Sequence, residues 1–407
     1  MQRLAPGRPT RDHHGGVGGY LVVLAVAVVT TLVTTPLVRR VAIRGGAVQA
    51  PDERRVHERP TPVLGGLAMY LGFLTAMATA TRVEQFDPVF AGNSEPIAIV
   101  LGASVVFLVG LVDDLREVSP PAKMSGQVLA ASVLAFLGVT MLFFRIPFGG
   151  IISLSPDMAF FATVLWVVCM AQAINIIDGL DGLAAGIVAI AAGSFALYSD
   201  KLFDKGLLPN DSTSMSPLLA VIVLGICLGF LPSNFHPARI FMGESGASLL
   251  GLLMAASTLL VGGQTAESVS GSTYFFFAPL FIPIVILGVP IFDTAFAIVR
   301  RVSRRQSATT ADKDHLHHRL MRLGHGQRRA VLILWAWTAL LSGFALWPVY
   351  TERGNFLVPF ALAAAAIALY TVFHPEVRRV RSEGPRNGEA DGRQLELDLE
   401  REPNLRP

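Results

Sequence analysis

Long apolar runs recur along this 407-residue chain, and they restrict its fold more than any other feature. A helix rises about 1.5 Å per residue and the hydrocarbon core of a bilayer is about 30 Å thick, so a span needs about 20 mostly apolar residues. A helix satisfies its own backbone groups inside lipid. We therefore predict an all-α polytopic membrane protein with eleven transmembrane helices, near residues 19–38, 63–81, 96–112, 125–143, 159–175, 183–199, 216–231, 246–262, 274–299, 330–348 and 355–373.

The composition agrees with this fold class. Hydrophobic residues make up 52% of the chain and charged residues only 15%, whereas about a quarter of a soluble domain is charged. We divide the chain into an N-terminal tail (1–18), a membrane domain (19–373) and a cytoplasmic tail (374–407), and we expect both tails to be disordered. The first run is followed by Arg39 and Arg40 and lacks a small-residue cleavage site, so we interpret it as a retained anchor.

Basic residues in the loops predict the orientation. The loops after odd-numbered runs hold eighteen Lys and Arg, and the loops after even-numbered runs hold five. Since basic loops stay in the cytoplasm, the N-terminus is expected outside and the C-terminus inside. The proline-containing ninth run, with Pro279, Pro283 and Pro290, is expected to be broken or bent.

Composition gives little support to nucleic-acid binding, and the two cysteines give little support to a disulfide or a cysteine metal site. The net charge is only +3, and no nucleic-acid-binding module is found, so we expect no nucleic-acid partner. Cys169 and Cys227 both lie inside apolar runs, and we interpret them as small buried hydrophobic residues.

Adjacent carboxylates close the third run. Asp113 and Asp114 repel one another and are costly to desolvate at a membrane boundary. They also lie at a helix C-terminus, where the dipole is negative. A solvated helix end would tolerate them, but a bound cation would remove both objections.

A second polar cluster, Asn175-Ile-Ile-Asp178-Gly-Leu-Asp181-Gly182, follows the fifth run. If this segment is helical, Asn175, Asp178 and Asp181 share one stripe. The alternative is a polar turn between two helices. The two glycines would let the backbone approach a ligand closely.

Two more clusters lie on the side predicted to be cytoplasmic. Asn234 and Phe241 precede the eighth run together with Glu244, which could bind Mg²⁺ or Mn²⁺ through oxygen; alternatively, Ser245 only caps the helix that follows. The loop after the ninth run holds further basic and histidine side chains, which would cradle a diphosphate: Arg304, Arg305, His315, His317 and His318. Alternatives for this loop are a zinc site, which no His/Cys spacing supports, and a solvated basic loop. Carboxylates, cationic side chains and glycines on one side together favour metal-assisted phosphoryl transfer.

At these residues the sequence resembles the polyprenyl-phosphate N-acetylhexosamine-1-phosphate transferases. The matching segments are HERPTPVLGG, GLVDDL with Lys123 and Gln127 downstream, NIIDGLDGLAAG, FMGESGASLLG and DKDHLHHRL. HLHHRL and PIFDT look like the WecA-like branch rather than the phospho-MurNAc-pentapeptide translocases. The resemblance implies transfer of GlcNAc-1-phosphate from UDP-GlcNAc to decaprenyl or undecaprenyl phosphate. It also implies an active site on the cytoplasmic side of the inner membrane and a homodimer.

Residue roles follow from the resemblance, with one departure. It implies that His57, Lys123, Asn175, Asp178, Asp181, Asn234, Arg304 and Arg305 bind substrate and that Phe241 stacks on uracil. Mg²⁺, for which Mn²⁺ could substitute, is expected on Glu244 and Asp114, where the family usually has Asp in place of Glu244. Asp113 would orient or deprotonate the lipid phosphate, or alternatively form a covalent phospho-aspartate. Two functional alternatives stay open: another UDP-sugar donor such as UDP-MurNAc-pentapeptide, and a polytopic transporter or flippase.

Overall fold

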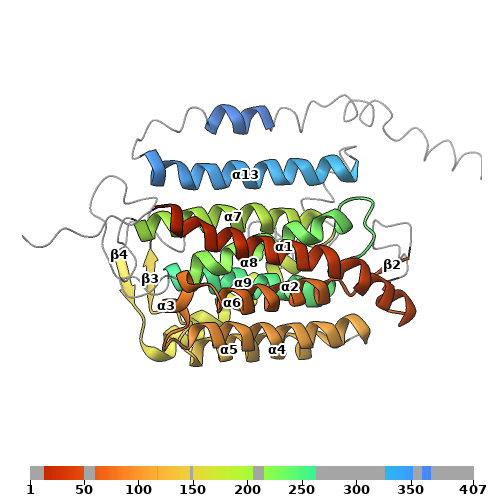
Figure 1. Ribbon diagram of the computed structural model, residues 1–407, viewed down its shortest axis with the longest axis horizontal. Helices are drawn as coiled ribbons and strands as arrows, with labels where there is room; N and C mark the ends of the chain where they lie inside the picture. The colour runs from red at the N-terminus through yellow and green to blue at the C-terminus, as the bar shows by residue number, and fades with distance from the viewer. Residues whose placement is uncertain are drawn as a thin grey trace, which may run out of the picture.

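The computed structural model describes residues 13–49, 60–116, 118–146, 150–204, 215–262, 326–351 and 360–367. Within these residues the protein is a bundle of helices that lie side by side along one direction (Figure 1). Its helices are α1 (His13–Arg44), α2 (Gly65–Ala80), η1 (Glu84–Phe86), α3 (Asp87–Phe90), α4 (Glu95–Leu115), α5 (Pro120–Phe136), α6 (Pro156–Ile177), α7 (Leu183–Asp204), α8 (Met215–Asn234), α9 (Gly243–Gly262) and α13 (Gln327–Thr351). A helical segment also covers 360–367.

Two short antiparallel pairs cap the bundle. Strands β1 (Val48–Gln49) and β2 (Thr61–Pro62) pair at the end where α1 finishes. Strands β3 (Phe143–Ile146) and β4 (Gly150–Ser153) form a hairpin at the opposite end (Figure 1).

The apolar runs are confirmed as helices wherever the structure describes them in full, with one correction. Seven helices in the described part are long and apolar enough to cross a membrane, and α2 is a shorter apolar helix. The fourth run was predicted to be helical over 125–143, but α5 ends at Phe136 and Phe143 starts a strand. Gly138, with φ of 101°, turns the chain there. The ninth run and its predicted bend lie outside the described residues, so the count of eleven stays a prediction.

Two further expectations change. Helix α1 begins at His13, inside the segment 1–18 that we expected to be disordered. Cys227 is buried as expected, but Cys169 is exposed on α6. The correction has a simple reason: the outer face of a membrane bundle contacts lipid, so an apolar run does not imply burial in protein.

Helix α9 is the centre of the bundle. Of its membrane-length window, 94% of the residues are buried. It contacts α2, α4, α6 and α8. The first turn of α9 therefore lies where the ends of several other helices meet.

The helices alternate in direction, which gathers the predicted polar clusters. The C-terminal ends of α1, α4, α6 and α8 lie at the same end of the bundle as the N-terminal ends of α2, α5, α7, α9 and α13 (Figure 1). Hydrogen bonds connect this end: Arg39 donates to the carbonyl of Arg239, and Arg328 to that of His236.

Candidate active site

Asp114 caps the first turn of α9. Its Oδ1 accepts the backbone N–H of Glu244 at 2.7 Å, and its Oδ2 accepts the N–H of Ser245 at 3.2 Å and the Ser245 hydroxyl. The sequence identified a carboxylate that is unfavourable at the C-terminus of its own helix. The structure places it at the positive N-terminus of another helix, where a negative charge is stabilised. Both Asp114 oxygens are therefore occupied, and Ser245 is the partner of the cap rather than the cap itself.

Close backbone approach makes this cap possible. Gly243 has φ of 72°, and a Cβ there would lie 2.5 Å from both Asp114 carboxylate oxygens. A Cβ on Gly110 would lie 2.5 Å from the Cα of Ser245. Since real Cβ contacts are never this short, only glycine brings α4 against the first turn of α9.

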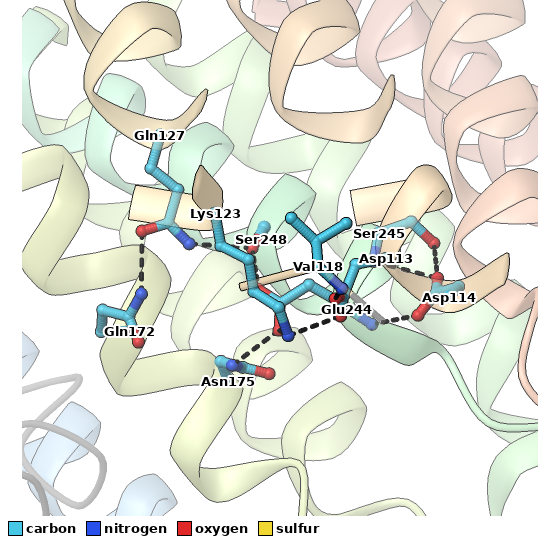
Figure 2. Close-up of polar contacts among 10 residues, drawn as sticks. All are labelled: Asp113, Asp114, Val118, Lys123, Gln127, Gln172, Asn175, Glu244, Ser245 and Ser248. Carbon is cyan, nitrogen blue, oxygen red and sulfur yellow. Dashed lines mark hydrogen bonds and ion pairs between the residues drawn. The ribbon is translucent and has the colours of Figure 1, made fainter. Parts of the chain in front are cut away.

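Glu244 is held by three neighbours from three helices (Figure 2). Asn175 Nδ2 donates to Oε2 at 2.9 Å, and Ser248 donates to Oε1 at 2.8 Å. The Lys123 ammonium lies 4.0 Å from Oε2. With only 11% of its side chain exposed, Glu244 is a fixed, largely buried carboxylate of the polar site.

Asp113 shares the same lysine. Its Oδ2 lies 2.6 Å from Lys123 Nζ, and its Oδ1 accepts the N–H of Val118 at 2.9 Å. Lys123 therefore reaches the Asp113 carboxylate directly and the Glu244 carboxylate at longer range. Because it is only 29% exposed, this ammonium offsets negative charge in a partly desolvated place.

The second cluster forms a turn and not a helical stripe. Helix α6 ends at Ile177 and α7 begins at Leu183, so Asn175 is helical while Asp178 and Asp181 lie in the connection. Gly182, with φ of 77°, cannot continue a helix. The predicted shared stripe is therefore wrong, and the alternative of a polar turn between two helices is what the structure shows.

Buried and partly buried hydrogen bonds fix this turn to the segment before α9. The Asp181 carboxylate oxygen Oδ2 lies 2.7 Å from His236 Nδ1 and accepts the N–H of Ala238 at 3.0 Å. Asn234 accepts the N–H of Gly182 at 3.1 Å and donates to the carbonyl of Ile240 at 3.1 Å. The Asn234 side chain thus binds the backbone of both Gly182, before α7, and Ile240, before α9.

Asp178 experiences the accumulated negative charge. Burial, followed by the charges of Asp114, Glu244 and Asp181, raises the pKa of the Asp178 carboxyl well above its usual value. An added cation in this place would offset that charge.

The remaining predicted residues divide into two groups. Phe241 lies next to the site, where its backbone bonds the carbonyl of Pro62 and the N–H of Gly65. The other predicted residues lie outside the described residues: His57, Arg304, Arg305, His315, His317 and His318. Sequence reasoning missed Ser248, Gln172 and His236, and it used Gln127 only as part of a motif. The polar side chains inside apolar runs were the signal that could have found Ser248 and Gln172.

The described side chains fit a Mg²⁺ ion that takes few protein ligands. Among the described residues, no three His, Cys, Asp or Glu side chains gather into a metal site. Two carboxylates, Asp113 and Glu244, do lie around one ammonium. Mg²⁺ in phosphoryl-transfer sites is typically bound by one or two carboxylates together with substrate phosphates and water, so these two carboxylates are the candidate protein ligands.

Fold and site define a multi-pass membrane protein with a carboxylate-rich polar site at one end of its helix bundle. The profile described as Glycosyl transferase family 4 matches residues 96–262, which contain Asp113, Asn175 and Glu244. The chain belongs to this family, and the resemblance expected from its motifs is confirmed.

Similar proteins cover most of the chain. The decaprenyl-phosphate N-acetylglucosaminephosphotransferase of Mycolicibacterium smegmatis is 37% identical over 365 residues, which is 88% of this chain and 89% of that protein. The protein of the same name from Mycobacterium leprae is 38% identical over 340 residues, 82% of this chain and 85% of its own. The phospho-N-acetylmuramoyl-pentapeptide-transferase of Desulforudis audaxviator is 32% identical over 352 residues, 80% and 97% of the two chains.

Proposed function

We propose that this chain transfers GlcNAc-1-phosphate from UDP-GlcNAc to a polyprenyl phosphate, giving polyprenyl-diphosphate-GlcNAc and UMP. One observation carries the proposal: the fixed Glu244 and Asp113 carboxylates meet at Lys123 in a chain similar over 88% of its length to a decaprenyl-phosphate N-acetylglucosaminephosphotransferase. The similarity to proteins named for the MurNAc-pentapeptide reaction is lower, at 32% identity. This difference favours UDP-GlcNAc as the donor.

The reaction requires that two anions come together. An oxygen of the lipid phosphate forms a bond to the β-phosphorus of the donor, and the bond from that phosphorus to the oxygen shared with the α-phosphate breaks, which releases UMP. Charge neutralisation and alignment are the main requirements of such a transfer. Lys123 supplies fixed positive charge beside Asp113, and Asp113 orients the attacking phosphate.

A general base contributes less than positioning does. A phosphomonoester has a second pKa of about 6, so most of the lipid phosphate is already ionised at neutral pH. Asp113 is also engaged by Lys123 at 2.6 Å, which favours an orienting role. We therefore prefer direct transfer over the covalent phospho-aspartate.

We include Mg²⁺ in the proposed mechanism, with Mn²⁺ as a substitute. Glu244 would hold it together with Asp113 or Asp114, and each of these carboxylates would exchange a present partner for the ion. The bound ion would supply positive charge to the diphosphate of the donor. Loss of activity on chelation with EDTA, restored by Mg²⁺, is the expected outcome; full activity in EDTA would remove the ion from the mechanism.

We also propose that the site faces the cytoplasm and that the chain crosses the membrane eleven times. The homodimer stays a prediction. Two single-cysteine variants, Lys313→Cys and Ser153→Cys, test the orientation in a background without Cys169 and Cys227. An impermeant maleimide added to intact cells should label position 153 and not position 313. The reverse pattern would invert the topology.

The reaction itself is tested with the purified full-length chain in lipid nanodiscs. Radiolabelled UDP-GlcNAc and decaprenyl phosphate should give a labelled lipid and one UMP for each lipid formed. UDP-MurNAc-pentapeptide should be a poor donor in the same assay. Turnover of the pentapeptide donor at an equal or higher rate would overturn the proposed donor, and absence of any lipid product would overturn the function.

A further inference from the structure

A chain of side-chain hydrogen bonds extends from the polar site into the apolar bundle (Figure 2). Gln172 Nε2 on α6 donates to Gln127 Oε1 on α5 at 2.9 Å. Gln127 Nε2 donates to Ser248 Oγ on α9 at 3.3 Å. Ser248 donates to Glu244 Oε1 at 2.8 Å. Three helices thus contribute to one linear path that ends on a carboxylate.

The charge of Glu244 fixes the direction of every bond. A carboxylate only accepts, so Ser248 must donate to it. The Ser248 oxygen is then free to accept the Gln127 amide N–H, and the Gln127 carbonyl is left to accept from Gln172. All three donors therefore direct their positive ends towards Glu244, and aligned hydrogen bonds strengthen one another in a low-dielectric interior.

Burying these polar side chains in an apolar bundle costs free energy, so their presence calls for a structural or functional reason. Gln127 and Ser248 are each only 2% exposed. Polar side chains inside membrane bundles are rare and mark functional positions, although some only attach helices to each other. The hydrogen bond from Trp166 to Thr258, at 2.8 Å, only attaches one helix to another, because it reaches no charged group of the site.

We propose that Ser248 and Gln127 are positioning residues, which orient the Glu244 carboxylate for the transfer reaction. The proposal rests on the proposed function. It also accounts for the Glu at a position where Asp is expected: Glu244 and Ser248 lie four residues apart on one helix face. The additional methylene carries the carboxylate about 1.5 Å further along that face, into contact with the Ser248 hydroxyl at 2.8 Å.

A double-mutant cycle tests the coupling. Ser248→Ala should lower kcat about tenfold in the parent enzyme, the expected effect of losing a hydrogen bond to a charged group, with a smaller change in KM for UDP-GlcNAc. In a Glu244→Asp background the shorter side chain no longer reaches residue 248, so the same change should lower kcat less than twofold. Gln127→Leu should show the same dependence on background.

A second pair of variants isolates the hydroxyl, and it applies even if Glu244→Asp turns over too slowly to measure. Threonine and valine have the same shape, and only threonine carries a hydroxyl. Ser248→Thr should keep a rate several times higher than Ser248→Val. Unfolding temperatures, measured for each variant, show that the proteins are folded.

Ser257→Ala is the matched control. Ser257 is buried on the same helix, but its hydroxyl donates to the carbonyl of Leu253 at 2.9 Å and not to the site. This change should leave kcat within twofold of the parent. Equal losses from Ser248→Ala in both backgrounds, or equal rates for the Thr and Val variants, would overturn the positioning role. Failure of the parent enzyme to use UDP-GlcNAc would instead overturn the proposed function.

Discussion

The cap of α9 by Asp114 offers the most direct test of the site geometry. Asp114→Asn keeps the shape of the side chain but removes its charge and one acceptor oxygen. The N–H groups of Glu244 and Ser245 both use this carboxylate, so at least one of them loses its partner. A helix cap is worth about 1 kcal/mol and the charge–dipole interaction up to about 1 kcal/mol. The first turn of α9 should therefore be destabilised by about 2 kcal/mol.

Amide hydrogen exchange measures this quantity locally. About 2 kcal/mol corresponds to a roughly 30-fold increase in the population of the opened turn. The amides of Glu244 and Ser245 should exchange faster by about that factor in nanodiscs, while amides in the middle of α9 keep their rates. Ser245→Ala removes only the hydroxyl contact with Asp114 and should give a smaller increase.

Asp113→Asn is the control, because Asp113 contacts Val118 and Lys123 and makes no hydrogen bond with α9. It should leave the exchange of Glu244 and Ser245 unchanged. If Asp114→Asn also left the exchange of these two amides unchanged, the Asp114 carboxylate would not stabilise the first turn of α9, and the capping role would be refuted.

Three further predictions concern neighbouring groups. Lys123→Met should lower kcat at least 100-fold in the lipid-product assay, because it leaves Asp113 and Glu244 without their shared cation. Asn234→Ala should destabilise the protein by about 2 kcal/mol, seen as a lower unfolding temperature, because two buried backbone groups lose their partner. The pKa of Asp178 is higher in the folded protein than the value of about 3.9 in the unfolded chain. The stability that this carboxyl contributes is therefore fully present below about pH 3.9 and is lost as the pH rises through the folded pKa. Asp178→Asn should therefore remove a fall in unfolding temperature with rising pH and leave the variant more stable than the parent at pH 8.

The sequence predicted the helices well because their signal is local. A run of apolar residues long enough to span a bilayer has few alternatives, and α4, α6, α8 and α9 lie where they were expected. Errors appeared where a single residue changes the backbone. Gly138 ends α5 before its apolar run ends. Helix α6 ends at Ile177, and Gly182, with positive φ, directly precedes α7, so the predicted helical stripe is a turn. Apolar composition cannot reveal where a helix ends, because the residues before and after the end of the helix are equally apolar.

The site was predicted by residue type but not by partner. Sequence reasoning correctly found that Asp114 is unfavourable in its own helix, and it assigned the relief to a cation. The structure also supplies backbone donors 130 residues further along the chain, a distance over which no pattern predicts contact, and the cation stays a prediction. The same holds for Glu244: its departure from the family pattern was visible, but the Ser248 hydroxyl that its longer arm reaches was hidden in an apolar run. In the sequence, Glu in place of Asp at position 244 looks like a change that only disturbs the geometry of a ligand. In the structure, the Glu244 carboxylate has its own hydrogen-bond donors, Asn175 and Ser248.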